Sequence, residues 1–552
     1  MPVYKTPGVY VEEISTLPPS VAEVATAVPA FIGYSEVGPA DDADPVVARI
    51  TSLLEFKTLF GRAQRMKWKL SVDAAGPSIA PAGTGGGFTL YYAISHYFKN
   101  GGGPCYVASV GSYAATPSKD RYIDGLAAIA KEDEPTLLVL TDAASTLAAG
   151  AYLEVCAEAL GQCQALGDRF TILDVPGGKW DAFRNDPSLS ANLMYGAAYH
   201  PYLQTTLAVE YNEGDVTVLR TGGKPSTVSG SLILGGATGL TVSFTGNAGS
   251  MPAVAITAGA KGAKPGFALS GLTLTLSDVN ACSAADIAAA WTTWKMTNNA
   301  GGFDVSKIGD GSAVVATADA PAAAISLPAA AADTLASVKA SNNETSLYNA
   351  ARLLLDAQRV VLPPSAAVAG IYARVDRDQG VWKAPGNVGV LAVLGPVSKV
   401  TNDEQDRLNV DDTAGKSINA IRAFTGKGTL VWGARTLAGN DNEWRYVSVR
   451  RLFITIEESA RKATSFAVFE ANDATTWLKV KAMIESYLYG LWERGALAGP
   501  KPEAAYYVNV GLGSTMTPQD VLEGRMVVEI GVAAVRPAEF IVLRFSHKLQ
   551  TE

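Results

Sequence analysis

The chain has 552 residues, which is too many for one hydrophobic core, so we expect two or more domains. Its composition, 48% hydrophobic and 18% charged, is typical of a folded soluble protein with a lightly charged surface. The formal net charge of -8 argues against a general phosphate-binding role, and therefore against a nucleic-acid partner.

Membrane insertion and secretion are not indicated by the sequence. No window approaches 18 uninterrupted apolar residues, and the N-terminal MPVYKTPGVYVEEI lacks a charged region followed by an apolar core. We therefore expect synthesis in the cytoplasm without a signal peptide. The cysteines are few, and the spacing of Cys156 and Cys163 fits neither a zinc site nor a redox motif. Cys105, Cys156, Cys163 and Cys282 are expected to be buried, reduced thiols.

The first 20 residues predict an extended linker arm. PGVYVEEI begins at Pro7, carries apolar Val9, Val11 and Ile14, and is cut off by LPPS at residues 17–20. Such an arm is well placed to leave its own subunit. The alternative is an ordinary first strand in the chain's own sheet.

An α/β core is expected over residues 21–203 and 346–430. Val28 begins a short apolar strand, Thr51 or Ser52 caps a helix, and residues 71–87 are predicted to form a loop. A helix is expected from Thr89 to Lys99. PTLLVLTDA, the helix from Tyr152 to Leu166 and FTILDVP follow in the order strand, helix, strand, which predicts a parallel pair with a right-handed crossover.

The composition shifts between residues 204 and 345. The run from Pro225 to Ala260 has no charged residue, and short β-rich pieces alternate with glycine turns. SAADIAAAWTTWKM is the one helix-like patch. We interpret this stretch as a mainly β domain inserted into a surface loop of the core. The helix from Leu347 to Ala357 returns the chain to the core.

Residues 431–536 predict a further domain. Apolar residues recur at helical spacing between Trp444 and Lys462, and again between Asp473 and Arg494. The last residues, 537–552, change to a period of two, with Ile541, Leu543, Phe545 and Leu549 on one face. A strand this close to the end has no following element to cover its edge, which invites pairing with another chain.

No pattern of catalytic, cofactor-binding or metal-binding residues stands out, so we expect no enzyme activity and no cofactor. Gly83, Gly85, Gly86 and Gly87 do not have the spacing of a phosphate-binding loop. The three histidines, His96, His200 and His547, lie in distant segments, and HExxH, GxSxG and CxxC are absent.

Two groups of charged residues nevertheless deserve a structural explanation. Asp142 and Asp174 follow predicted strands and are expected to serve as turn or cap residues rather than as catalytic carboxylates. Arg374, Asp376, Arg377 and Trp382 are expected to form a turn-stabilising ion pair and a packed aromatic.

Several segments, in the right order, closely resemble contractile tail sheath proteins, the family of phage tail, tailocin and extracellular contractile injection system sheaths. In the last 120 or so residues these are EWRYVSVRRLF, FEANDATTW, LWERGALAG and IGVAAVRPAEFIVLRFS. Earlier segments with the same resemblance are PGVYVEEI, VPAFIGYSEVGP, FKNGGGPCYVASV, YGAAYHPYL and PPSAAVAGIYARVDRDQGVWKAPGN.

The resemblance implies a mixed α/β sheath core, an outward-facing mainly β insertion, and N- and C-terminal arms that extend the sheets of neighbouring subunits. It implies a structural subunit that polymerises helically around an inner tube in a metastable extended state and contracts to drive the tube through a target envelope. The implied partners are other copies of the chain, the inner tube protein, and baseplate and terminator or cap proteins. The host particle is a phage tail or phage-tail-like particle, kept in the cytoplasm or released.

Two sets of residues follow from the resemblance. Strand exchange between subunits is assigned to Val9, Tyr10, Val11, Ile14, Phe540, Ile541, Leu543, Phe545 and Leu549. The candidates for contact with the inner tube are Lys479, Lys481, Glu485, Glu493 and Arg494. The alternatives to a sheath subunit are an α/β enzyme with an inserted lid domain and a non-contractile capsid or surface protein. An ordinary solvated helix face is the alternative for the second set.

Overall fold

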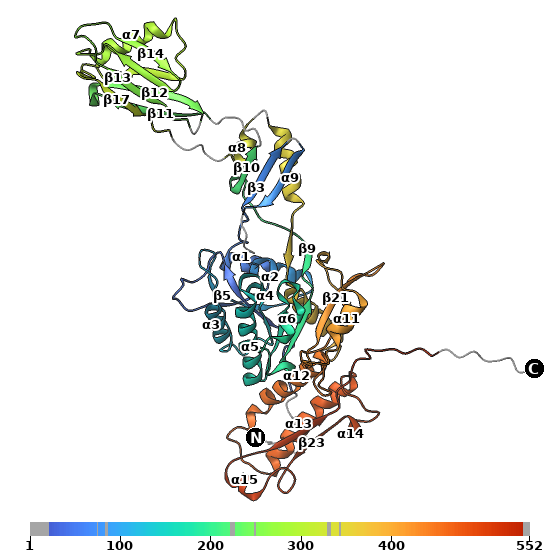
Figure 1. Cartoon of the computed structure of the whole chain (residues 1–552). Coiled ribbons are helices and arrows are strands. Elements are labelled where there is room, and N and C mark those ends of the chain that lie inside the picture. The colour runs from blue at the N-terminus through green and yellow to red at the C-terminus, as the bar shows by residue number, and fades with distance from the viewer. Residues whose placement is uncertain are drawn as a thin grey trace, which may run out of the picture. The chain divides into compact units, whose positions relative to one another are not determined.

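The computed structural model describes residues 21–73, 75–82, 87–220, 227–247, 250–327, 333–341 and 344–544. The chain forms two compact units (Figure 1). The first takes its described residues from Met1–Met66, Thr84–Glu210 and Asp356–Glu552, and the second from Lys67–Gly83 and Tyr211–Leu355. A mixed α/β architecture with several domains, as expected, is confirmed. The second unit overlaps most of the expected insertion and also includes a segment far from it in the sequence.

The core of the first unit is a sheet that contains nine strands of the described chain, in the order β19-β22-β21-β8-β7-β6-β1-β5-β2. The central strands, from β21 to β5, are parallel. β2, β22 and β19 add antiparallel edges. The predicted parallel pairing of PTLLVLTDA with FTILDVP is confirmed as β6 beside β7. The bounds are β1 Pro29–Ser35, β2 Val46–Ile50, β5 Cys105–Ser112, β6 Leu137–Val139, β7 Phe170–Asp174, β8 Gly196–His200, β19 Val388–Gly389, β21 Ile418–Phe424 and β22 Gly428–Val431.

Helices pack on both faces of this sheet. Phe31 and Ile32 are neighbours in β1 and therefore point to opposite faces. The Phe31 ring lies 5.2 Å from the ring of Tyr97 in α2, whereas Ile32 approaches Gly125 of α3 so closely that a Cβ there would lie 2.6 Å from Ile32 Cγ2. The helices are α1 Leu53–Phe60, α2 Leu90–Lys99, α3 Lys119–Ile129, α4 Thr141–Thr146, α5 Ala149–Leu166, α6 Trp180–Asn185, α10 Ser365–Gln379 and α11 Asn402–Asn409.

Most local predictions for the core are confirmed. α2 covers the predicted Thr89 to Lys99 helix, α5 the Tyr152 to Leu166 helix, and the Ser52 hydroxyl caps α1 by accepting a hydrogen bond from the Glu55 amide. A smaller sheet in the same unit consists of β18 Arg359–Leu362, β9 Leu203–Ala208 and β20 Val393–Pro396.

The end of the first unit is a domain of two long helices and a short sheet. The predicted helices are confirmed as α12 Val447–Ala463 and α13 Ala474–Glu493, the second capped by the Asp473 carboxylate. Leu452 and Ile456 of α12 share a core with Ile484 and Leu488 of α13. Short helices α14 Pro502–Ala505 and α15 Pro518–Leu522 accompany strands β23 Tyr506–Val510 and β24 Val528–Val532.

The second unit contains a segment that the sequence analysis assigned wrongly. Residues 71–87 were predicted as a loop, but most of their first half lies in β3 Trp68–Asp73 and β4 Gly76–Pro81. Trp68 and Leu70 alternate with more exposed residues and are buried, and β3 pairs in parallel with β10 Val216–Arg220. GPSIAP has little intrinsic strand preference, and its structure is decided by antiparallel pairing with β3, which itself pairs with β10 from a distant part of the sequence. Helices α8 Leu335–Ala340 and α9 Thr345–Asp356 belong to the same part of the fold, and α9 confirms the helix expected from Leu347.

The rest of the second unit is the mainly β part. One sheet is β11-β12-β16 and the other is β14-β15-β13-β17. Phe244 and Phe303 of the first sheet, Leu276 of the second, and Trp291 of helix α7 Ala284–Lys295 share one buried core. α7 confirms the helix-like patch. The strands are β11 Thr227–Leu234, β12 Leu240–Asn247, β13 Ala253–Thr257, β14 Gly266–Ser270, β15 Thr273–Ser277, β16 Phe303–Lys307 and β17 Ala320–Ala324.

Candidate self-assembly surfaces

A two-stranded sheet in the C-terminal domain has room for further strands. β23 and β24 are antiparallel, with Tyr506 opposite Val532 and Val510 opposite Val528. In the described part of the chain they belong to no larger sheet. Two strands alone are marginally stable, and an unpaired strand edge presents N–H and C=O groups to any incoming strand. The sheet therefore has the form of an acceptor for strands from another chain.

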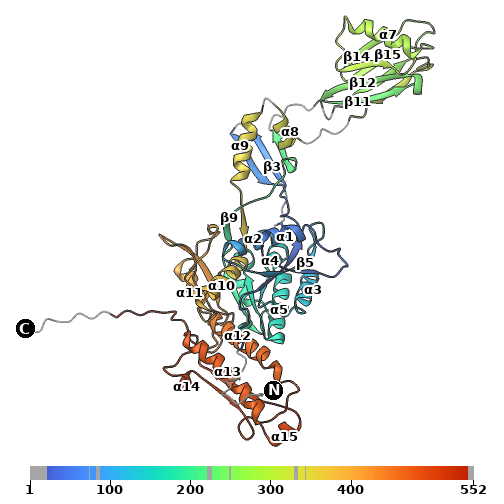
Figure 2. The same ribbon diagram turned by 180° about the vertical axis from the view of Figure 1, so that it is seen from behind.

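The residues that follow β24 supply an apolar segment without a partner. Phe540, Ile541, Val542 and Leu543 are 71%, 80%, 76% and 72% exposed. In Figures 1 and 2 this dark red end of the described chain runs away from the domain. No strand forms over residues 540–544, although the sequence predicts one from Ile541 onward. A strand needs a neighbouring edge for its backbone hydrogen bonds, and the isolated chain offers none there.

Only part of the predicted strand-exchange set can be placed. Phe540, Ile541 and Leu543 lie together in the exposed segment. Phe545 and Leu549 lie outside the described residues, as do Val9, Tyr10, Val11 and Ile14 at the other end. The assignment of these residues to strand exchange stays a prediction.

The exposed segment begins directly after a clamp on Glu539. The Glu539 carboxylate accepts hydrogen bonds from Arg435 Nη2 at 2.6 Å, Arg435 Nε at 2.9 Å, Asn409 Nδ2 at 2.8 Å and Tyr446 Oη at 3.3 Å. Burial alone would raise the pKa of Glu539, but the hydrogen bonds from Arg435 and Asn409 outweigh it and the pKa is lowered. The carboxylate is therefore ionised and firmly held at neutral pH.

A second clamp holds the start of the described chain. The Arg451 guanidinium of α12 donates from Nη2 to the Thr26 carbonyl oxygen at 2.7 Å, and it pairs with both oxygens of Asp376 at 3.0 and 2.5 Å. Arg451 also stacks over the Tyr372 ring, 4.6 Å from its centre. Two residues earlier, the Val24 amide donates to Ser459 Oγ of the same helix. The polypeptide entering β1 is thus fastened across α12.

This fastening corrects one interpretation. Arg374, Asp376, Arg377 and Trp382 were expected to include a turn-stabilising ion pair. Asp376 instead pairs with Arg451, which is 75 residues away, and Arg374 donates to the Gly389 carbonyl oxygen. The prediction of a local ion pair was wrong because the side chains of Asp376 and Arg451 are both buried. A buried charge needs a close partner, and two parallel hydrogen bonds between carboxylate and guanidinium supply it.

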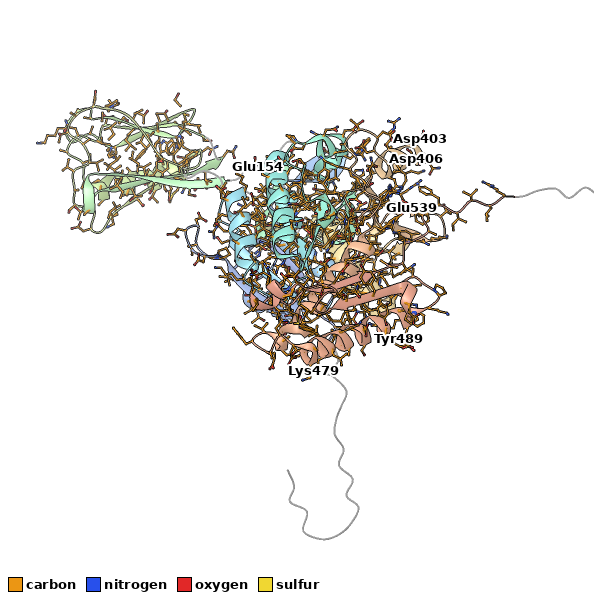
Figure 3. The ribbon with its side chains drawn as sticks, turned by 90° about the horizontal axis from the view of Figure 1, so that it is seen from below. Glu154, Asp403, Asp406, Lys479, Tyr489 and Glu539 are labelled. Atoms are coloured by element: carbon orange, nitrogen blue, oxygen red, sulfur yellow. The ribbon has the colours of Figure 1, made fainter. Side chains whose placement is uncertain are left out.

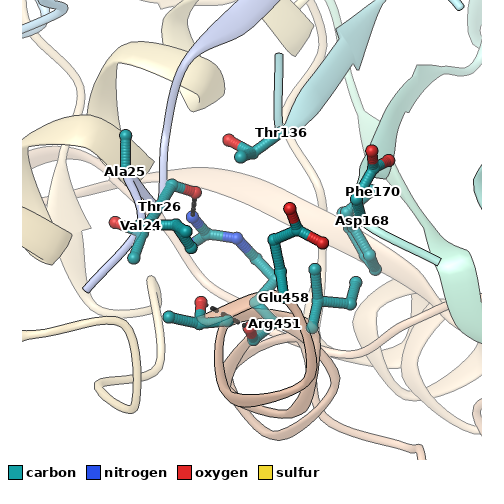
Figure 4. Close-up of a pocket in the computed structure, with 10 residues that line it drawn as sticks. Val24, Ala25, Thr26, Thr136, Asp168, Phe170, Arg451 and Glu458 are labelled. Carbon is teal, nitrogen blue, oxygen red and sulfur yellow. Dashed lines mark hydrogen bonds between the residues drawn. The ribbon is translucent and has the colours of Figure 1, made fainter. Parts of the chain in front are cut away.

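A pocket lies beside the same clamp (Figure 4). Its lining includes Thr26, Thr136, Asp168, Arg451 and Glu458. The carboxylates are already paired, since Asp168 bonds to Arg169 and Glu458 bonds to Arg461 and Lys462. The pocket is a seam between α12 and the entering chain rather than a site with spare ligand groups.

The tube-contact candidates lie on α13 and at its end. Lys479, Glu493 and Arg494 are exposed, and Lys481 lies 3.7 Å from Glu485 on the next turn. Arg494 pairs with Glu23 at 3.0 Å and lies over the Trp382 ring, 5.4 Å from its centre. In Figure 3, Lys479 and Tyr489 lie at the periphery of the domain. Since Lys479 and Lys481 are two residues apart on α13, they point to different sides of the helix, and contact of this set with the inner tube stays a prediction.

The two aspartates at strand ends are cap residues. Asp142 is buried and accepts hydrogen bonds from the amides of Tyr34, Thr89 and Leu90, so it caps the start of α2. Asp174 accepts from the Ser365 amide at 2.8 Å and the Ser365 hydroxyl at 2.5 Å, and caps α10. Burial raises the pKa of Asp142, and it raises the pKa of Asp174 to about 7 despite the bonds from Ser365.

The described histidines and all cysteines occupy interior positions. Burial lowers the pKa of His96 and of His200 to about 4, and His96 Nε2 lies 3.0 Å from the Leu391 carbonyl oxygen. Cys105, Cys156, Cys163 and Cys282 are buried and unpaired, as predicted. Among the residues that the structure describes, no cluster of His, Cys, Asp or Glu is arranged to hold a metal, and no helix is long and apolar enough to span a bilayer. His547 lies beyond the described range.

Sequence reasoning missed the two clamps. The available signal was an isolated glutamate, Glu539, between Pro537 and a terminal apolar run. Arg435 and Arg451 carried no comparable signal, because their partners are more than 70 residues away.

Comparisons with known proteins agree with this picture. Residues 439–548 match the family model for the phage tail sheath C-terminal domain. The tail sheath protein of Vibrio phage KVP40 is 25% identical over 185 residues, which cover 33% of this chain and 26% of that protein. The match thus spans about a quarter of the length of this curated relative.

Two solved structures align over nearly the whole chain. The PVC sheath complex of an extracellular contractile injection system, in the contracted state, is 26% identical with a TM-score of 0.54, and the alignment covers 100% of this chain and 99% of that one. The contracted helical sheath of the anti-feeding prophage is 25% identical with a TM-score of 0.55, covering 99% and 100%. With the family model over residues 439–548, the curated relative and both structures in agreement, the chain is similar to proteins of the contractile tail sheath family.

Proposed function

We propose that the chain is a structural subunit of a contractile sheath, which polymerises helically around an inner tube and contracts to drive that tube through a target envelope. The observation that carries the proposal is an exposed apolar segment, Phe540 to Leu543, in a chain whose C-terminal sheet has only two strands. The resemblance to two sheaths in contracted states supports it. The sheath would be part of a phage tail or a phage-tail-like particle.

Strand exchange is the proposed linkage. The arm at residues 1–20 and the terminal strand at residues 537–552 each extend the β23-β24 sheet of a different neighbouring copy. Backbone hydrogen bonds supply the attachment, and the alternation of side chains fixes its register. Because such contacts are head-to-tail and do not close, they propagate as a helical array rather than a dimer.

Contraction requires that the bodies slide while the arms stay attached. The extended array is metastable, and the bodies relax into more extensive contacts without a nucleotide or a cofactor. Contact with the tube through complementary charges is proposed for charged residues of α13 and the residue after it, Lys479, Lys481, Glu485, Glu493 and Arg494. The mainly β insertion faces outward, and the ends of the sheath meet baseplate and terminator or cap proteins.

Negative-stain microscopy of the purified full chain, alone and co-expressed with its tube protein, tests the proposal. Long hollow rods are expected. A persistent monomer would contradict the sheath and favour an enzyme with a lid domain, whereas sheets or shells would favour a capsid or surface protein. A chain ending at Glu539 keeps the whole described body except residues 540–544, so it should stay folded and fail to form rods. Rods from that truncation would rule out a linkage through the terminal strand.

A further inference from the structure

Both ends of the described polypeptide are attached next to one helix turn. Tyr446, which contacts Glu539, is the residue before α12, and Arg451 lies in the second turn of α12. At 1.5 Å per residue, the two positions are separated by about 8 Å along the helix. The entering chain at Thr26 and the leaving chain at Glu539 therefore converge on the same short stretch.

The leaving chain has a well-defined last attachment. Val535 still bonds to the C-terminal domain through the Ala496 carbonyl oxygen, and Arg536 donates to the Asn442 carbonyl oxygen at 2.6 Å. Glu539 is then held by Arg435, whose side chain is only 4% exposed. From Phe540 to Leu543 the side chains are at least 71% exposed. The chain is therefore hydrogen-bonded to the body at Glu539 and largely exposed from the next residue, Phe540.

The arginines are themselves held by the core. The Arg435 amide donates to Asn419 Oδ1 of β21, and its carbonyl oxygen accepts from Asn419 Nδ2. Its Nη1 donates to the Asn409 carbonyl oxygen of α11. Arg451 is tied to α10 through Asp376 and Tyr372. A buried charge with several partners does not exchange them for water at low cost, so both attachment points are rigid on the scale of the domain.

We propose that Arg435 and Arg451 are positioning residues that anchor the two linker arms to the body, at Glu539 and at Thr26. Bending during sheath movement is then confined to the chain after Glu539 and to the chain before Glu23, because Val24 and Glu23 are also attached to the body. The inference rests on the proposed function, which it deepens. Because both attachment points lie at the start of α12, a displacement of either arm is transmitted to the body there. The two arms are therefore coupled to the same rigid element.

The test uses spin-label distances in the full chain. The natural cysteines are all buried, so labels can be placed at Asp406→Cys in α11 and at Ile541→Cys. A narrow distance distribution is expected when Glu539 is intact. Glu539→Ala should increase the released fraction on the order of tenfold, the ratio expected from losing one charge-assisted pair, and widen the distribution. Glu523→Ala, which removes the same charge from an exposed pair with Arg525, should leave it unchanged.

For the entering chain, hydrogen exchange gives the readout. Arg451→Lys keeps the charge opposite Asp376 but loses the planar fork, so the amides of residues 24–28 should exchange faster while those of α13 do not. Arg525→Lys, at the exposed pair with Glu523, is the control.

Each outcome has one meaning. Equal distance distributions in wild type and Glu539→Ala, together with unchanged exchange in Arg451→Lys, would overturn the inference even if the wild type forms rods. Monomers that never form rods but show the predicted widening and faster exchange would contradict the sheath function and leave the attachment points intact. Since the Glu539 side chain is 21% exposed, its variant is expected to fold.

Discussion

Arg451 and Asp376 form a bidentate ion pair in which neither side chain is more than 4% exposed. The pair joins α12 to α10, and thus the C-terminal domain to the α/β core. Removing one charge would leave the other buried without its partner.

Asp376→Asn is accordingly expected to lower the free energy of unfolding by about 3 kcal/mol, because Arg451 keeps its charge in an apolar setting. Denaturant unfolding measures the loss. Asp378→Asn is the matched control, since Asp378 pairs with Arg377 at the surface, and its effect should stay below about 0.5 kcal/mol. Replacing both partners, as Arg451→Met with Asp376→Leu, should recover part of the stability. Equal losses in Asp376→Asn and Asp378→Asn would contradict the assigned role.

The buried carboxyl of Asp174 predicts that the stability of the fold decreases as pH rises. An aspartate whose pKa is lowered by a surface ion pair has the opposite effect. Its pKa is about 7 in the folded chain and about 4 when unfolded, so between these values the folded state binds the extra proton. This group's contribution to stability therefore falls as pH rises from 4 to 7, by up to about 1.4 kcal/mol per pH unit, and is constant above that range. Asp174→Asn keeps an acceptor for Ser365 but does not titrate. Its stability relative to wild type should rise with pH, and a constant difference would refute the shift.

Replacement by alanine is expected to have opposite effects on stability at two helical glycines. A Cβ on Gly125 of α3 would lie 2.6 Å from Ile32 Cγ2 and 2.7 Å from Val110 Cγ1, so Gly125→Ala should cost about 1–3 kcal/mol through overpacking. Gly161 of α5 has no neighbouring atom within 4 Å of that position, so Gly161→Ala should stabilise the helix by about 1 kcal/mol. Thermal unfolding of both variants decides. A stabilising Gly125→Ala would mean that α3 does not pack closely on β1.

Substitutions in the exposed segment from Phe540 to Leu543 are expected to affect assembly but not the stability of the single chain. Ile541→Ser with Leu543→Ser removes apolar surface that nothing covers in the single chain, so the free energy of unfolding should change by less than about 0.5 kcal/mol. Rod formation should nevertheless be lost, because the incoming strand would lose half of its apolar face, with only Phe545 and Leu549 remaining. Leu353→Ser, at a residue of α9 that is 73% exposed, is the control and should leave rods intact. Rods from the double variant would show that the segment is not an interface.

His96 and His200 contribute to the pH dependence of stability with a sign opposite to that of Asp174. His96 and His200 have pKa values near 4 when folded and about 6.5 when unfolded, so their contribution to stability rises with pH across that interval. Replacing both by Gln should remove this rise, which unfolding at several pH values between about 4 and 7 will measure. An unchanged slope would mean that the imidazoles reach solvent.

Periodicity predicted the long elements well because it depends on a nearly local property. α12, α13, α5 and the parallel β6-β7 pair follow from apolar spacing and from the order of the segments. β3 and β4 did not follow, because β3 pairs with β10, about 150 residues away, and β4 adds to the sheet only through β3. The same limit applies to Asp376, whose ion-pair partner is chosen by tertiary packing and not by its neighbours in the sequence.

The assembly residues divide in a similar way. A period of two marked Ile541 and Leu543 as a strand face, yet a face forms a strand only when a second edge lies beside it. Glu539 and Arg435 could not be paired in advance, since 104 residues separate them and neither stands in a recognisable motif.

The burial of every thiol has a consequence for durability. Desolvation raises the pKa of Cys105, Cys156 and Cys163 far above neutrality, so almost no reactive thiolate exists at any pH the particle meets. Peroxide or oxygen therefore meets no exposed cysteine thiol through which a disulfide could link adjacent copies. An array whose purpose is to slide would stay free to do so after long storage in an oxidising medium.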